Sequence, residues 1–159
     1  MSDLLNMIMI NYIAIFTKNN VILRVYAKGL FVRLFLWIHI SLMRRLGNDC
    51  ERKRISNQEM INLVSDKQNI LAVCRTRNLN SSLVFLAASL NSVCIVPAVG
   101  NLSSIGSFFE YPVYSPFSLR QIYSCIKLST NTNIESHIVE KEKQYKNMVE
   151  RRLLKILQI

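Results

Sequence analysis

The sequence is poor in the residues that most enzyme sites need. Its 159 residues include only four glycines, three prolines, four cysteines and two histidines. The segment from Asn78 to Phe109 has no charged residue, so it offers neither a general base nor a carboxylate that would bind a metal. No glycine lies between Arg75 and Ser82, and no Gly-Lys-Ser/Thr triplet is present, which argues against a nucleotide-binding loop. We therefore expect no catalysis, no cofactor and no small-molecule substrate.

The four cysteines occur singly, at positions 50, 74, 94 and 125. No Cys-x-x-Cys pair exists, and His39 and His137 stand apart from the cysteines, so the spacing of a zinc site is missing. Cys74 and Cys94 fall in apolar runs, where a free thiol behaves as a small apolar residue. We expect no disulfide framework, which fits a reducing compartment.

Positive charge is what the chain has in excess. Its net charge is +10, although half of its residues are apolar. Between Lys18 and Arg77 there are twelve Lys and Arg against four Asp and Glu. A polyanionic partner explains this combination, and composition leaves open whether the partner is nucleic acid or an anionic membrane surface.

Two short apolar runs define the expected core. Ile70–Cys74 and Val93–Val99 are separated by a helical stretch, Ser81 to Leu90. Apolar runs of this length around a crossover helix are typical of parallel strands buried on both faces. We predict an α/β fold, a short parallel sheet with flanking helices and a flavodoxin- or Rossmann-like βαβ core. Pro97 lacks a ladder donor, so the second strand should end near Val96 or have Pro97 at its margin.

The amino-terminal region, residues 1–65, is expected to combine helix and strand. Leu4 to Phe16 is apolar but too short to cross a hydrocarbon core, which needs about 20 residues. It resembles neither a signal peptide nor an Arg-rich presequence, so a protein working in an organelle would be made there. Val21–Tyr26 has strand composition, and Leu30 to Leu46 is predicted as a core helix that also packs on a neighbouring protein, with shallow insertion of Leu34–Met43 into a membrane as the alternative.

Local signals define the next elements. Gly47-Asn48-Asp49 is predicted as a turn that ends the helix before it. Ser56 followed by Glu59 predicts a capping box and a helix to about Ser65. Gly100 to Ser107 is predicted as a loop by composition.

The rest of the chain is divided into a core, residues 66–130, and a tail, residues 131–159. Phe108 and Phe109 are interpreted as a buried pair in preference to a platform for stacked bases. Ser118 to Leu128 is predicted as a helix lying on the sheet. Its apolar face is expected to contain Leu119, Ile122, Tyr123 and Ile126. Ile134 to Ile159 is predicted as a charged amphipathic helix that docks on a partner or packs on its own domain.

Two groups of cations are the candidate RNA-binding residues. Five of them bracket the turn within eleven residues. Two more lie at the carboxyl end of the first core strand, the edge at which ligands bind in open α/β sheets, close to a helix amino end. Guanidinium groups bind phosphates and release condensed counterions. The candidates are Arg44, Arg45, Arg52, Lys53, Arg54, Arg75 and Arg77.

The stretch from Ile70 to Leu128 also resembles a known family. A buried strand is followed by Asn101, by an acidic residue with Tyr-Pro and an aliphatic residue, and by a helix with a Leu-Arg-x-Ile pattern. This order is similar to the carboxyl-terminal half of the universal small-subunit ribosomal protein family S-two. The matching residues are Asn101, Tyr111, Pro112, Val113, Leu119, Arg120 and Ile122. The family's strand-end Asp is replaced by Val99-Gly100 and its Gly-Asn-Asp-Asp turn by Tyr114 to Phe117, and its long helical hairpin and amino-terminal half are not recognisable.

The resemblance implies a structural constituent of the small ribosomal subunit, a divergent mitochondrial member that binds ribosomal RNA and neighbouring ribosomal proteins, the tail helix among its contacts. The implied location is the mitochondrial matrix, with the gene in the organelle, and a composition rich in Ile, Asn, Leu and Ser suits an AT-rich gene. The alternative is a small membrane-associated organellar protein that uses Leu4–Phe16 and Leu34–Met43 as anchors. A flavodoxin-like ligand-binding enzyme is a third class.

Overall fold

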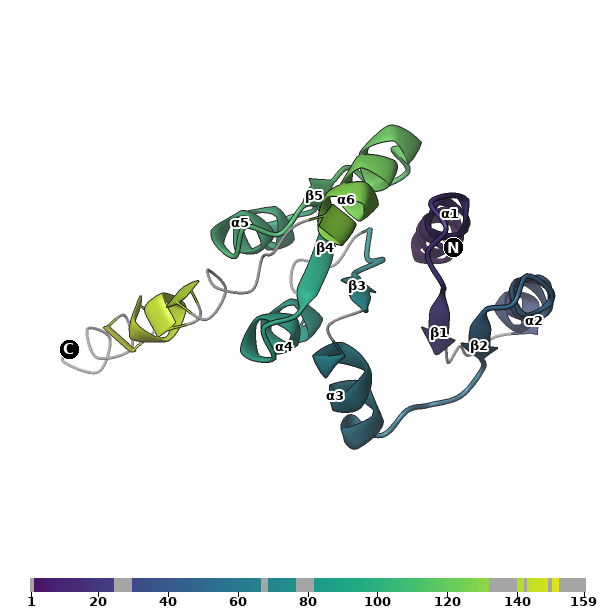
Figure 1. Cartoon of the computed structure of the whole chain (residues 1–159), viewed down its shortest axis with the longest axis horizontal. Coiled ribbons are helices and arrows are strands. Elements are labelled where there is room, and N and C mark those ends of the chain that lie inside the picture. The colour runs from purple at the N-terminus through teal and green to yellow at the C-terminus, as the bar shows by residue number, and fades with distance from the viewer. Residues whose placement is uncertain are drawn as a thin grey trace.

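A computed structural model describes residues 2–24, 30–66, 69–76, 82–131, 140–141, 143–148 and 150–151. Helices and strands alternate along the chain (Figure 1). The first half contains α1 (Ser2–Phe16), β1 (Ile22–Arg24), α2 (Leu30–Arg45), β2 (Asp49–Glu51) and α3 (Asn57–Ser65). The second half contains β3 (Ile70–Ala72), α4 (Ser82–Ser89), β4 (Val93–Pro97), α5 (Asn101–Phe108), β5 (Val113–Tyr114) and α6 (Leu119–Asn131).

The described strands form two parallel sheets. β1 pairs with β2, and β4 lies between β3 and β5. The predicted α/β class, with short parallel sheets flanked by helices, is confirmed. Pro97 is the last residue of β4, as expected. Because alternate amides point to opposite sides of a strand, the donor that Pro97 lacks would face β3 beyond the last pair, Ala72 with Ile95.

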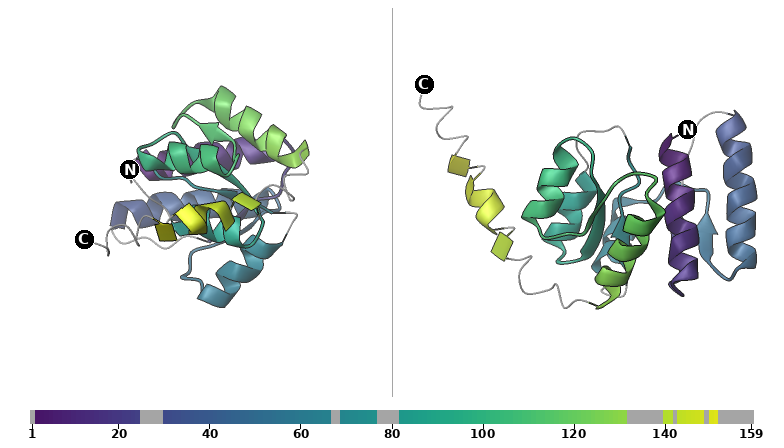
Figure 2. Two further views of the ribbon diagram at one scale, coloured as in Figure 1. Left: turned by 90° about the vertical axis from the view of Figure 1, so that its left-hand side faces the viewer. Right: turned by 90° about the horizontal axis from the view of Figure 1, so that it is seen from above.

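β4 is buried between two apolar layers. Cys94 and Val96 face a cluster formed with α3, α4 and α5, whereas Ile95 faces a cluster formed with α1 and α6. Figure 2 shows α1 and α6 side by side, and the two helices are in contact. A strand covered on both faces has no polar side, which explains why its sequence does not alternate.

α1 joins the two sheets, although no element was predicted for this stretch. Its residue Met7 belongs to the apolar cluster of β1, β2 and α2, and its residue Ile10 belongs to the cluster on β4. Cys74 packs against both clusters. The position of α1 across the two sheets therefore holds the amino-terminal elements on the core.

A buried asparagine fixes the position of α1. Asn6 Nδ2 donates hydrogen bonds to the carbonyl oxygen of Cys74, at 3.2 Å, and to the hydroxyl of Tyr114, at 3.0 Å. Asn6 Oδ1 accepts from the backbone N–H of Phe117, at 3.3 Å. The Tyr114 hydroxyl in turn donates to the carbonyl oxygen of Val73, at 2.6 Å. One side chain thus links α1 to the ends of β3 and β5.

The loop predicted for Gly100 to Ser107 is wrong, because α5 spans Asn101–Phe108. Gly100 has a φ of 49°, a value that glycine adopts without strain, and it precedes the helix. A Cβ at Gly106 would lie 3.2 Å from side-chain atoms of Val96 and Val113, so the missing side chain lets α5 approach the sheet closely. Burial of Leu102 adds to this packing, which overrides the weak helix propensity of Gly and Ser.

Two predicted boundaries in the amino-terminal half are confirmed. α2 ends at Arg45, and Gly47 adopts a left-handed φ of 81° in the turn that follows. Ser56 is the N-cap of α3, and its hydroxyl oxygen accepts from the N–H of Glu59 at 3.1 Å. β2 was not predicted, because three residues with a single buried side chain, Cys50, give no strand pattern.

The helix predicted for Ser118 to Leu128 is confirmed as α6, but one residue of its predicted apolar face is wrong. Leu119 is 58% exposed. The residues of α6 buried against the sheet are Ile122, Cys125, Ile126 and Ser129. The face is therefore rotated toward Cys125 and Ser129, two small residues that an apolar count overlooks.

The described part of the tail packs on its own domain. Residues 140–141, 143–148 and 150–151 are helical, and the rest of the predicted tail helix lies outside the described residues. The ring of Tyr145 lies 5.7 Å from that of Phe108 and 5.8 Å from that of Phe109. Phe109 is buried and Phe108 half-buried, which confirms the predicted aromatic pair. Lys141 Nζ lies 3.2 Å from Glu110 Oε1.

The Asn6 network predicts a specific loss of stability. Asn6→Ala removes the donor to Tyr114 and the acceptor for Phe117, and the free energy of unfolding should fall by about 1–3 kcal/mol. Leu5→Ala changes an exposed residue of the same helix and should cost less than about 0.5 kcal/mol. Urea denaturation followed by circular dichroism measures both. Equal losses would show that α1 does not dock through Asn6.

Candidate nucleic-acid interface

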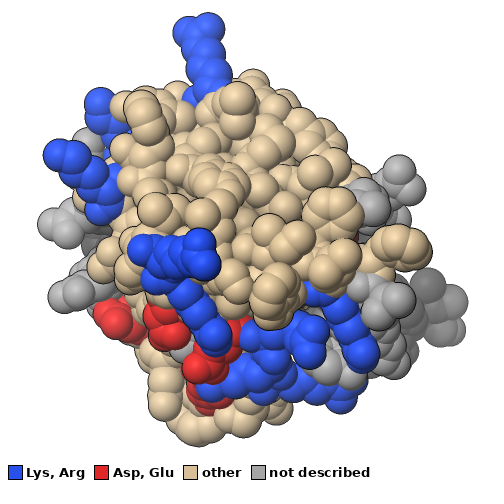
Figure 3. All heavy atoms as spheres, turned by 90° about the vertical axis from the view of Figure 1, so that its right-hand side faces the viewer, with Lys and Arg blue, Asp and Glu red and all other residues tan. Residues whose placement is uncertain are grey.

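The α2 to β2 connection places five candidate cations around one part of the surface. Arg44 and Arg45 are in the last turn of α2, and Arg52, Lys53 and Arg54 follow β2 directly. All five are exposed. Figure 3 shows Lys and Arg atoms gathered along the lower part of this face, with acidic atoms beside them. The predicted cluster therefore exists as a surface feature, although it is not purely basic.

Arg44 links the end of α2 to β2, and so connects the cations before the turn with those after it. Its Nε donates to the carbonyl oxygen of Cys50 in β2, at 2.7 Å. This hydrogen bond directs the Arg44 side chain from the end of α2 toward β2. Cys50 itself is buried under α2, so the contact also keeps the helix end on the strand.

Lys53 is neutralised by two carboxylates. Its Nζ lies 2.9 Å from Glu51 Oε2 and 3.0 Å from Glu59 Oε1. Hydrogen bonds to Glu51 and Glu59 raise the pKa of Lys53 above its usual value. Within the described part of the chain, Arg45 and Arg52 have no such partner. These two guanidinium groups are therefore the most accessible to a phosphate.

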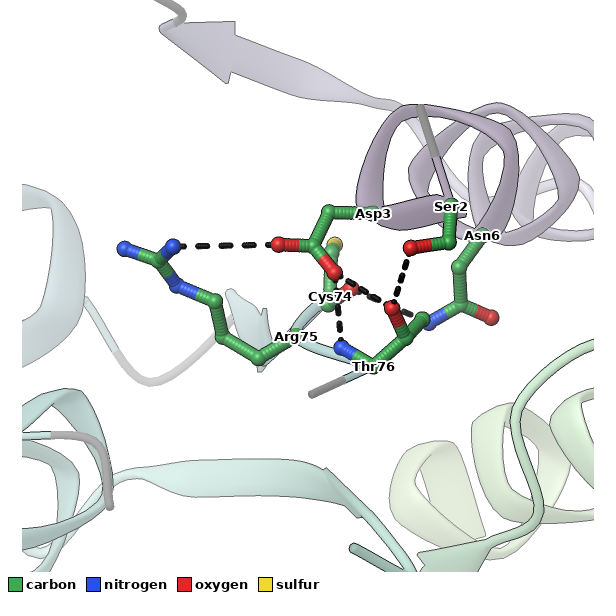
Figure 4. A network of polar contacts seen from close by, with 6 residues as sticks. All are labelled: Ser2, Asp3, Asn6, Cys74, Arg75 and Thr76. Atoms are coloured by element: carbon green, nitrogen blue, oxygen red, sulfur yellow. Dashed lines mark hydrogen bonds and ion pairs between the residues drawn. The ribbon is translucent and has the colours of Figure 1, made fainter. Parts of the chain in front are cut away.

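The carboxyl end of β3, the second predicted cation site, is occupied by α1 (Figure 4). Asp3 Oδ1 accepts from the backbone N–H of Thr76 at 2.8 Å and from the Thr76 hydroxyl at 2.6 Å. Arg75 Nη1 lies 3.7 Å from Asp3 Oδ2. Ser2 Oγ is 2.8 Å from the Thr76 hydroxyl oxygen. A carboxylate of the chain itself thus sits where a phosphate was predicted.

The second arginine predicted at the carboxyl end of β3 is Arg77. Arg77 lies outside the described residues, as do residues 78–81 before α4. Arg75 remains exposed over about half of its side chain, so its pairing with Asp3 is open to solvent. Sequence reasoning did not foresee Asp3, because 72 residues separate it from Arg75 and no element was expected to bring them together.

Burial alone would raise the pKa of Asp3, but the hydrogen bonds from Thr76 and the charge of Arg75 outweigh it. The net result is a pKa below the usual value of the carboxyl group. Asp3 also lies in the first turn of α1, where the helix dipole favours a negative charge.

Burial governs the other titratable groups of the core. Burial raises the pKa of Cys74 to about 12 and also raises that of Cys94, so both thiols stay protonated. His39 is buried with its Nε2 3.0 Å from Asn11 Nδ2, and burial lowers its pKa. Among the described residues, no three His, Cys, Asp or Glu side chains are grouped to hold a metal ion.

A second surface feature is apolar. The side of α2 that points away from the protein exposes large hydrophobic residues over its whole length, and the inward side buries a separate set. The exposed residues are Phe31, Leu34, Phe35, Trp37, Ile38 and Leu42. None of the helices in the described ranges has the length and apolar character needed to cross a bilayer.

Comparison with known proteins returns no match: no family model, no curated protein and no solved structure matches this chain. The resemblance to the ribosomal family therefore stays a prediction based on the residues quoted for it.

The Asp3 contacts predict how stability depends on pH. The pKa of Asp3 is lower in the folded than in the unfolded chain, so its contribution is present above the unfolded value, near 3.8, and is lost as the pH falls through the folded value. Asp3→Asn should be less stable than the wild type at pH 7, and the two should converge below pH 3.8. Thermal midpoints across this range measure the difference. A constant gap between the two curves would contradict the assignment.

Proposed function

We propose that the chain is a structural constituent of the small subunit of a mitochondrial ribosome. It binds ribosomal RNA through the cations around the α2 to β2 turn and touches neighbouring ribosomal proteins. The observation that carries the proposal is the exposure of Arg45 and Arg52 beside the oriented Arg44, on a chain with a net charge of +10. Phosphate groups of folded RNA complement such a surface.

The positions that resemble the ribosomal family support the proposal through their structural roles. Asn101 begins α5 shortly after β4 ends. The Tyr111 hydroxyl donates to the carbonyl oxygen of Ser92 at 3.0 Å, and the carbonyl oxygen of Pro112 accepts from Val96 N–H at 3.0 Å. The Tyr-Pro segment therefore attaches β5 to the central strand, a role that a shared fold would require of it.

The seven candidate cations are expected to contribute unequally. Arg45 and Arg52 meet phosphate without losing a partner, whereas Lys53 must exchange two carboxylates for it. Arg75 must likewise give up Asp3. Replacing one anion by another gains less than filling an open position, because the first interaction is lost. The interface is thus centred on the α2 to β2 turn. The proposal includes no catalysis, cofactor or small-molecule substrate.

Sedimentation of the tagged full chain from its own cells tests the proposal. The chain should travel with the small ribosomal subunit in a sucrose gradient and should be released by nuclease or by high salt. Recovery at the top of the gradient in low salt, with intact subunits present, would refute the ribosomal assignment.

RNA affinity provides a second test. Arg45→Gln/Arg52→Gln removes two exposed cations, so the slope of log affinity against log salt for a small-subunit ribosomal RNA transcript should fall by about 1.5–2. Filter binding at several salt concentrations measures it.

The matched control is Arg120→Gln/Lys127→Gln, which removes two exposed cations of α6 and leaves the same net charge. An equal loss of slope in both double variants would mean that binding follows total charge and has no site at the α2 to β2 turn.

A further inference from the structure

α2 is apolar on both sides, which is unusual for a helix at the surface. Its inward side buries Leu36, Ile40 and Met43 against β1 and β2. A surface helix normally turns a polar side to solvent. Here the outward side exposes Phe31 by 74% and Trp37 by 63%. Continuous exposed apolar surface of this kind marks an interaction site.

α1 extends this surface. The rings of Tyr12 and His39 lie 5.8 Å apart, and Asn11 contacts the same imidazole, so the two helices meet there. Tyr12 is exposed, and Leu5 and Phe16 lie seven residues before and four after it, on the same stripe of α1. Figure 3 shows a broad area without charged atoms across the middle and upper right of this face, with Lys and Arg atoms at its top and left edges and below it. We call the exposed apolar residues of α1 and α2 the outer face.

The charged residues of α2 itself have one sign. Between Leu30 and Arg45 the sequence has three arginines and no acidic residue. Arg33 and Arg45 are exposed on the same helix as the apolar residues. The acidic atoms in Figure 3 lie at the lower margin, and Asp49 and Glu51 belong to β2. Aromatic and aliphatic side chains next to arginines, on a helix without acids, suit an extended anionic surface.

We propose that the outer face docks on an anionic lipid bilayer. α2 lies parallel to the membrane, with Phe31, Leu34 and Ile38 on the stripe that faces the upper acyl chains and Arg45 at the headgroup phosphates. Phe35 and Trp37 lie on opposite edges of this stripe, at the level of the interface. The proposal shares Arg45 with the proposed RNA interface but depends on the exposed apolar residues of α2, which have no role in that interface. Vesicle binding and RNA binding can therefore fail separately. The occupant is inferred from charge, because α2 has three arginines and no acidic residue on a chain with a net charge of +10, which an anionic bilayer complements.

Trp37 serves as a fluorescence probe of the outer face, because it is the single tryptophan of the chain and is exposed there. The full chain is mixed with vesicles of phosphatidylcholine alone or of phosphatidylcholine with phosphatidylglycerol. The proposal expects flotation with the anionic vesicles, a blue shift of Trp37 emission, and protection from iodide. It is overturned if the chain neither floats nor shifts. It is equally overturned if the shift needs no vesicles and grows with protein concentration, which would mean that a second copy covers the face, or if it appears with RNA alone.

Two double variants, both with unchanged net charge, test whether vesicle binding depends on the outer face. Phe35→Ser/Ile38→Ser removes two exposed apolar side chains, at 53% and 52% exposure, and should weaken binding to anionic vesicles by roughly tenfold or more. The control Leu119→Ser/Leu128→Ser removes two equally exposed side chains from α6, at 58% and 55%, and should bind like the wild type. All four side chains are exposed. Circular dichroism of each variant checks that it is folded. Equal weakening in both variants would overturn the proposal.

Discussion

The structure depends on covering both faces of β4. Ile95 requires one apolar layer, and Cys94 with Val96 requires another on the opposite side. The chain meets this constraint with α3, α4 and α5 on one side and with α1 and α6 on the other. Because the central region from Asn78 to Phe109 has no charge, every cation of the protein lies outside it. A neutral core and a basic periphery are thus two results of one requirement, since ionised groups are costly to bury in such layers.

The need to cover β4 also divides the polar residues into two sets, those buried near β4 and those exposed near β2. Buried polar groups near β4, such as Asn6, Ser92 and Tyr111, form hydrogen bonds within the protein and position its elements. Among the exposed arginines near β2, Arg44 is joined to the scaffold by its hydrogen bond to the carbonyl oxygen of Cys50. A rigid support with cations on its surface is compatible with the proposed recognition of RNA by charge and shape.

Sequence reasoning succeeded where short-range signals and packing agree. The apolar runs predicted β3 and β4, and the Ser56 and Glu59 spacing predicted the start of α3. It failed where distant contacts decide the outcome. α5 forms from a Gly- and Ser-rich stretch because Gly106 fits closely against Val96, and no local pattern reports that fit. The capture of Arg75 by Asp3 was equally hidden, since it depends on where α1 docks. The cation cluster was foreseeable from its spacing, but the carboxylates that neutralise Lys53 required the fold.

The Asn6 network also constrains the order in which the protein is assembled. Asn6 and Tyr114 are separated by 108 positions, so the amino-terminal helix receives its hydrogen-bonding partner only after most of the chain has been synthesised. Until then Met7 of that helix has its partners in β1, α2 and β2, whereas Ile10 lacks the partners that β4, β5 and α6 supply. Contacts of such long range also slow folding, because a large loop must close before they stabilise the fold. We therefore expect the hydrogen bond between Asn6 and Tyr114 to form late in folding.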